Sequence, residues 1–164
     1  MSRTSYLIRY IIVSILGILL HFTYKWSGES QFIGLFSAAN ESTWEHLKLL
    51  FFPLLFLTVF DYFFLRPNRP EEFLPARTRG ILSGLAFIVI AFYTISGVIG
   101  QSYTFLDIAI YFIGLFIAFR TEHRHYEHFN ILTDFVAVLI LTIITLAFFI
   151  FTSHVPNLGI FREP

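Results

Sequence analysis

Residues able to bind a ligand or catalyse a reaction gather in the stretch AANESTWEHLK, residues 38–48, which directly precedes the apolar run LLFFPLLFLTVF. On a helix, Glu41 and Glu45 are spaced i,i+4, and so are Ser42 and His46, so the two pairs occupy neighbouring faces. Carboxylates and imidazoles are ligands for Zn²⁺ or Mn²⁺, and a carboxylate beside a metal can act as general base on a bound water. Without a metal, the same groups can shuttle a proton or hold a polar headgroup.

The same stretch also has the features of a helix start in a membrane protein. Ser42 and Glu45 form the S-x-x-E pattern of a capping box. Trp44 is typical of the aromatic belt at a membrane interface, and Lys48 can extend its amine toward water. Capping explains Glu45 but not His46, so a ligand site and a structural role remain open for this pair. Catalysis by Ser42 as a nucleophile is the weaker alternative, because the residue is already suited to a cap.

The elements that must position these residues belong to a membrane protein. The 164 residues are 56% hydrophobic, 20% aromatic and only 13% charged, with a mean hydropathy of +0.72, whereas a soluble domain has about 25% charged residues. The formal net charge is zero, so no basic surface indicates a nucleic-acid partner. The chain has no cysteine, which excludes thiol catalysis, disulfides and cysteine-ligated metals. The lipid bilayer is therefore the expected partner.

Five apolar runs are long enough for a helix that crosses the bilayer, which takes about 20 residues. A shorter apolar segment at 31–38 predicts an interfacial or re-entrant helix. The first run lacks a small-x-small cleavage site, so we expect it to be retained rather than removed as a signal peptide. The sequence thus predicts an all-α bundle of five transmembrane helices in one membrane domain, residues 1–164. The predicted spans are 6–23, 47–65, 80–99, 103–119 and 131–151.

Glycines and prolines refine this prediction. Pro53 lies inside the second run and is expected to kink it. The third run contains glycines that suit close helix packing. The segment between the second and third runs contains three prolines, which predict a true loop. The glycines are Gly84, Gly97 and Gly100, and the prolines are Pro67, Pro70 and Pro75.

Basic residues predict the orientation of the chain. With the N-terminus inside, the inner side would hold eight Arg and Lys residues and the outer side three. Because cytoplasmic loops of membrane proteins are enriched in Lys and Arg, we expect the N-terminus in the cytoplasm and the C-terminus outside. The stretch at 38–48 then faces outward.

Other polar residues are expected at the same outer level. His21 ends the first run, His154 follows the fifth, and Asp107 lies about 6 Å inside the fourth at 1.5 Å per residue. An ionisable residue within a span is a functional hypothesis by default, and Tyr93 lies about 10 Å down the third run. The candidate catalytic residues are Glu45 and Asp107, the candidate ligand-binding residues are Asn40, Glu41, Tyr93 and Asp107, and the candidate metal ligands are His21, Glu45 and His46.

Two further groups of residues are weaker candidates. His123, His125 and His128 form an H-x-H-x-x-H pattern that can bind metal, but a solvated linker explains them better. Asp61 and Asp134 lie near the inner ends of the second and fifth runs, where pairing with a loop arginine or helix capping is favoured over catalysis.

Several segments resemble one family along nearly the whole chain. They are HFTYKWSGES, GLFSAANESTWEHLKLLFFP, FYTISGVIG and FTSHVPNLGIFREP. Together they resemble a family of uncharacterised bacterial multi-pass membrane proteins, domain of unknown function 6512. The resemblance implies a bacterial plasma-membrane protein, and it implies no activity. It implies that nine residues match the family pattern, namely His21, Asn40, Glu41, Trp44, Glu45, His46, Lys48, Tyr93 and Asp107.

A second likeness bears on an enzymatic role. Ser42 and His46, with an aspartate in a span, are similar to metal-dependent membrane hydrolases of the alkaline ceramidase type, which have seven spans and a further H-x-x-x-H pair that this chain lacks. Three functions therefore remain open. The first is a small membrane protein that binds a divalent metal such as zinc or manganese, or a headgroup, in an outward pocket. The others are a metal-dependent hydrolase of a lipid or envelope substrate, and a proton- or ion-coupled transporter, for which five spans favour a homodimer.

Overall fold

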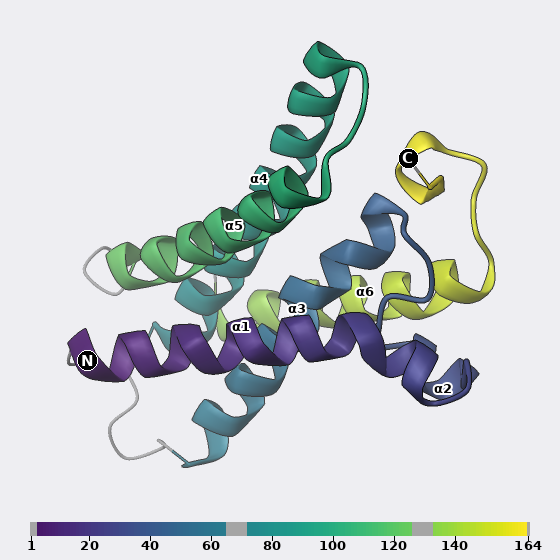
Figure 1. Cartoon of the computed structure of the whole chain (residues 1–164). Helices are drawn as coiled ribbons and strands as arrows, with labels where there is room; N and C mark the ends of the chain where they lie inside the picture. The colour runs from purple at the N-terminus through teal and green to yellow at the C-terminus, as the bar shows by residue number, and fades with distance from the viewer. Residues whose placement is uncertain (1–2, 65–71, 126–132, 164) are drawn as a thin grey trace.

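The chain folds into an all-α bundle, shown in the computed structural model of Figure 1, which describes residues 3–64, 72–125 and 133–163. Five helices in these ranges are long and apolar enough to cross a membrane, which confirms the predicted fold class. A single turn, α2, forms within the predicted interfacial segment. The elements are α1 (Arg3–Trp26), α2 (Gln31–Gly34), α3 (Thr43–Phe64), α4 (Phe73–Ile99), α5 (Thr104–His125), α6 (Asp134–Ser153) and the short 3₁₀ turn η2 (Gly159–Phe161).

Several helices extend beyond the predicted runs. Helix α4 begins at Phe73 instead of residue 80, so the loop prediction is wrong for Pro75. A proline in the first turn is tolerated because the N–H it lacks would have no partner within the helix. Helix α5 continues to His125, so His123 and His125 are helical rather than part of a linker. Pro67, Pro70 and His128 lie outside the described residues.

Helix α3 is the central helix of the bundle. About 56% of its membrane-spanning window is buried, against 17–28% for the other four long helices. Its residues Leu50, Phe51 and Phe52 are fully buried and pack with residues from α1, α4, α5 and α6. A helix that is apolar all round is expected in such a place, which explains why α3 reads as a nearly continuous apolar run.

The α4–α5 hairpin is packed through glycines. A methyl group added at Gly84 would lie 2.9 Å from the carbonyl oxygen of Gly114, so the missing side chain allows the two backbones to approach. The prediction of close helix packing is wrong for Gly97, where an added methyl would meet nothing within 4 Å. Gly100 instead ends α4 with a φ of 85°, a left-handed conformation that glycine adopts without strain.

The long helices alternate in direction, so polar residues gather at two ends of the bundle. At the end where α1 begins, which we call the N-terminal end, Arg77 binds Asp61 at 3.0 Å and Glu122 at 2.8 Å. Arg9 forms a further ion pair with Asp61. The expected pairing of Asp61 with an arginine is therefore confirmed, although Arg77 is buried within α4 instead of lying in a loop. The opposite end, which we call the distal end, holds the stretch at 38–48.

Candidate functional site

The start of α3 determines how the polar side chains at the distal end point. The side-chain oxygen of Asn40 accepts a hydrogen bond from the backbone N–H of Ser42 at 2.9 Å, which closes a local turn. The hydroxyl of Ser42 accepts one from the backbone N–H of Glu45 at 3.4 Å, as a capping residue does. Helix α3 begins at Thr43, so Glu41 lies before the helix. The two glutamates therefore do not share the i,i+4 relation expected of a continuous helix.

Three residues form what we call the histidine cluster: His21 of α1, His46 of α3, and Glu41 in the chain just before α3. One ligand atom from each lies within 4.8 Å of the others. The Nε2 atom of His46 is 3.4 Å from a carboxylate oxygen of Glu41. The two imidazole rings lie 5.3 Å apart between centroids and are tilted by 30°.

The hydrogen bonding of His46 determines which of its ring nitrogens faces the cluster. Its Nδ1 lies 2.9 Å from the backbone carbonyl oxygen of Ser42. A carbonyl only accepts, so Nδ1 carries the proton and, in the neutral ring, the lone pair of Nε2 faces the cluster. This is the arrangement in which metal-binding histidines are usually held, with the outer nitrogen bonded to a backbone carbonyl or a carboxylate.

The cluster lies in the wall of a cavity between α1, α3, α4 and α5. The cavity has a volume of about 490 Å³, within the range of pockets that bind small molecules. Asp107 of α5 lines the same cavity and is half-buried, and His46 is near enough to act on it electrostatically. Across residues 3–64, 72–125 and 133–163, no hydrogen bond or ion pair involves the Asp107 carboxylate.

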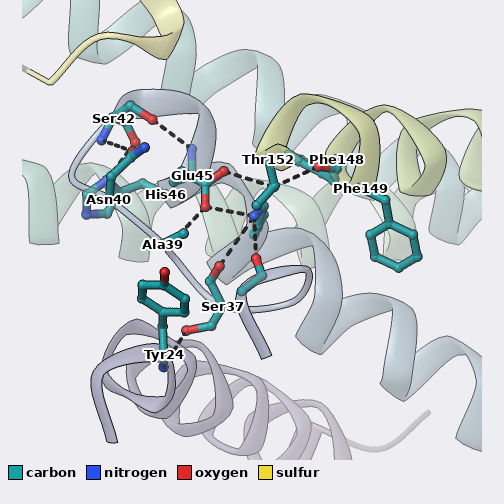
Figure 2. A network of polar contacts seen from close by, with 12 residues as sticks. Tyr24, Ser37, Ala39, Asn40, Ser42, Glu45, His46, Phe148, Phe149 and Thr152 are labelled. Atoms are coloured by element: carbon teal, nitrogen blue, oxygen red, sulfur yellow. Dashed lines mark hydrogen bonds and ion pairs between the residues drawn. The ribbon is translucent and has the colours of Figure 1, made fainter. Parts of the chain in front are cut away.

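Glu45 is separated from the two histidines that it was predicted to join. Figure 2 shows its carboxylate between Ala39 and Thr152. One oxygen accepts from the backbone N–H of Ala39 at 2.8 Å and from Nζ of Lys48 at 2.7 Å, and the other accepts from the hydroxyl of Thr152 at 3.1 Å. In the first turn of α3, Glu45 faces the interior and α6. The structure therefore separates Glu45 from His21 and His46, with which it was predicted to bind a metal, and places Glu41 beside them.

Lys48 and Trp44 also differ from their predicted places at the membrane interface. Lys48 is fully buried, and its Nζ donates to the carbonyl oxygen of Gly34 at 2.8 Å, so it fastens α2 to α3. The ring of Trp44 packs against Phe148 and Phe161, with centroids 4.7 and 4.9 Å away. Both side chains turn inward because the chain before α3 and the C-terminal segment cover this end of the helix.

The remaining candidates lie apart from the cluster. Tyr93 lines a second cavity of about 270 Å³ with Arg162 and Glu163. Asn40 is engaged in the turn before α3, and His154 is exposed at the C-cap of α6. The structure thus brings together His21, Glu41, His46 and Asp107 and leaves the other candidates elsewhere.

Tyr111 and Gly17 are among the cavity residues that sequence reasoning missed. Tyr111 lies one turn after Asp107, and its hydroxyl is buried without a hydrogen-bond partner among the described residues. Gly17 lies one turn before His21, and an added methyl there would collide with that hydroxyl. The spacing of four residues from a recognised candidate places both on a cavity-facing side of their helices and is the signal that could have found them.

Comparison with protein families gives a match along nearly the whole chain. A family model described as a family of unknown function, DUF6512, matches residues 2–164. No curated protein and no solved structure matches the chain. The match agrees with the resemblance noted in the sequence and supplies no activity.

Proposed function

Because the chain belongs to the family of unknown function DUF6512, we propose its function from the site: it is a multi-pass membrane protein that binds a divalent transition-metal ion at the histidine cluster. The observation that carries the proposal is the proximity of the three ligand atoms, within 4.8 Å of one another, in a cavity wall.

The donor set agrees with zinc or manganese. Two neutral imidazoles and one carboxylate are ligands that these ions accept in proteins. In a tetrahedral site, ligands bonded at about 2.1 Å lie about 3.4 Å apart. A pair of ligand atoms that is now 4.8 Å apart would therefore move together by about 1.4 Å on binding. Glu41 can supply this movement because it precedes α3 and its side chain is 50% exposed. Three protein ligands leave coordination positions open, as in catalytic zinc sites.

A second candidate function, metal-dependent hydrolysis, is favoured by Asp107. Asp107 is a half-buried carboxylate in the same cavity, with no hydrogen-bond or ion-pair partner in the described ranges, so it is suited to take up a proton. A metal held by His21, Glu41 and His46 would activate water for attack on an ester, amide or phosphoryl group of a lipid or envelope substrate, and Asp107 would accept the proton released. A transporter receives less support. The carboxylate of Asp61, which lies in the second span, is already paired with two arginines at the N-terminal end.

The proposal is tested by metal binding to protein purified in detergent. The wild type should retain about one equivalent of zinc or manganese by elemental analysis and should bind it by titration calorimetry. Removal of a residue that only hydrogen-bonds a metal ligand lowers metal affinity by about 10–100-fold. His21→Gln and His46→Gln remove a ligand itself, so each should lower metal affinity by more than this. His154→Gln is the matched control, because His154 is exposed and outside the cluster. Folded wild-type protein that binds no metal, or binding that survives both substitutions, would overturn the proposal.

The proposed orientation places the cavity on the outer side of a bacterial plasma membrane, following the distribution of basic residues. The absence of native cysteine makes this simple to test. Glu29→Cys, at the distal end, should react with a membrane-impermeant maleimide added to intact cells. Arg124→Cys, at the N-terminal end, should react only after the cells are opened. The reverse pattern would invert the orientation.

A further inference from the structure

The cavity beside the histidine cluster changes from polar to apolar along the bundle. His21, His46 and Asp107 line its distal part. Gly17 and Tyr111, four residues further from the distal end, line its inner part with Leu49 of α3. Four residues of helix correspond to about 6 Å. Since the change occurs at one level on three helices, the cavity matches a ligand that is polar at one end and apolar beyond it.

The cavity opens sideways between α1 and α5. Ile18 and Phe22 of α1 and Ile108 of α5 line it and are 45%, 42% and 53% exposed. Both helices are candidate membrane spans, so exposed side chains at this depth face lipid rather than water.

The contacts that join α1 to α5 lie nearer the N-terminal end. The rings of Tyr6 and Tyr10 pack on Phe119, and the hydroxyl of Tyr10 donates to the carbonyl oxygen of Phe112 at 3.1 Å. Toward the distal end, Figure 1 shows the tip of the α4–α5 hairpin splayed away from α1. The opening therefore lies at the level of the polar part of the cavity and just below it.

A free hydrogen-bonding group lies at the inner end. The Tyr111 hydroxyl is buried with no hydrogen-bond partner in the described part of the chain. Leaving such a group unpaired is costly, and a ligand oxygen located one helical turn below the headgroup would satisfy it.

We infer that this cavity binds a single-chain lipid amphiphile, with an anionic oxygen of its headgroup on the metal and its hydrocarbon chain leaving between α1 and α5. The inference rests on the proposed metal site. The open metal positions favour an anionic oxygen ligand, and the bilayer supplies amphiphiles at the depth of the opening. A cavity of about 490 Å³ suits one chain and a compact headgroup.

The test uses protein loaded with Co²⁺, whose visible absorption reports on ligands that join the metal. Two probes with the same headgroup chemistry, dodecyl phosphate and inorganic phosphate, are titrated into the protein in detergent. Dodecyl phosphate should change the spectrum at a concentration at least about 10-fold lower, because its chain also occupies the apolar part. Enrichment in micelles contributes to this difference, so the decisive comparison is between variants.

Ile108→Trp should fill the opening and remove most of the preference for dodecyl phosphate, while Co²⁺ still binds. Ile113→Trp, also on α5 and 48% exposed but away from the cavity, is the matched control and should keep the preference. Ile18→Trp closes the opening from α1 and replaces Ile108→Trp if that variant does not fold.

Four results would overturn the inference. Equal responses to the two phosphates would identify a site for a free anion. Equal preferences in Ile108→Trp and Ile113→Trp would show that the chain does not lie between α1 and α5. A change in oligomeric state in Ile108→Trp alone, seen by size exclusion with light scattering, would assign the opening to a second copy of the protein. Folded wild-type protein that fails to bind Co²⁺ would overturn the proposed metal site as well as the lipid inference. The other results would overturn the lipid inference alone.

Discussion

Replacement of Lys48 by methionine should destabilise the protein far more than the loss of one surface charge. The Lys48 and Glu45 side chains are 0% and 3% exposed, and their ion pair spans 2.7 Å. Methionine keeps an unbranched apolar stem but removes the ammonium. Among the residues that the structure describes, the buried Glu45 carboxylate then keeps only the N–H of Ala39 and the hydroxyl of Thr152 as hydrogen-bond donors. Breaking a buried pair in this way costs about 3–5 kcal/mol of unfolding free energy.

Two further variants separate this effect from a general loss of packing. In the double variant Lys48→Met with Glu45→Gln, no unpaired charge remains, so its cost should be smaller than the sum of the single costs by about 1–3 kcal/mol. Lys25→Met is the matched control. The Lys25 side chain is 75% exposed and lies 3.9 Å from Glu41, so its loss should cost less than about 1 kcal/mol.

The assay is unfolding in mixed micelles with increasing dodecyl sulfate, followed by tryptophan emission. Trp44 packs on Phe148 and Phe161 beside the pair, whereas Trp26 is 68% exposed, so Trp44 reports the unfolding of this region. The reasoning would be refuted if Lys48→Met cost no more than Lys25→Met, or if the double variant cost the full sum of its parts.

Three further predictions concern other parts of the bundle. Arg77→Met should cost about 3–5 kcal/mol in the same unfolding assay, because it leaves two buried carboxylates without a shared guanidinium. Gly84→Ala should cost about 1–3 kcal/mol, since its methyl would lie 2.9 Å from a carbonyl oxygen of α5, while Gly97→Ala has open space and should be neutral or stabilising by thermal melting. Asp107→Asn should leave the melting temperature unchanged or higher, because no hydrogen bond or ion pair within the described ranges is lost. A clear fall in melting temperature would instead identify a structural role for this carboxylate.

Hydropathy predicts the five spans because each long helix contains a long apolar segment. It does not predict where every helix begins and ends. Charges and prolines usually end a span, so the sequence places Arg77 in a loop. In the structure α4 begins four residues before Arg77, and the arginine is buried because Asp61 and Glu122 neutralise it. Partners from other helices decide whether a charge lies inside a bundle, and a single segment does not reveal them.

The candidate site shows the same limit at finer scale. Counting along the helices correctly brought His21 and His46 to one level. The choice between Glu41 and Glu45 depended on where α3 begins, and the start at Thr43 places Glu41 outside the helix and Glu45 within it. Tyr93 shows that a count gives depth along a helix but not direction around it, which tertiary packing decides.

The pairing of buried charges has a consequence for the way the chain enters the membrane. An isolated charge at the centre of an inserting helix costs about 2.5–3.5 kcal/mol. Lys48 and Glu45 are three residues apart on α3, so they can neutralise each other as soon as that helix forms.

The charges at the N-terminal end can also be paired in the order in which they are synthesised. Asp61 can pair with Arg9 of α1, which is made before it. Arg77 of α4 then meets Asp61, and Glu122 of α5 meets Arg77. From Asp61 onward, each new charge of this network finds an opposite charge on a segment that already exists. The order of the helices along the chain therefore allows this buried network to assemble during insertion with each added charge paired.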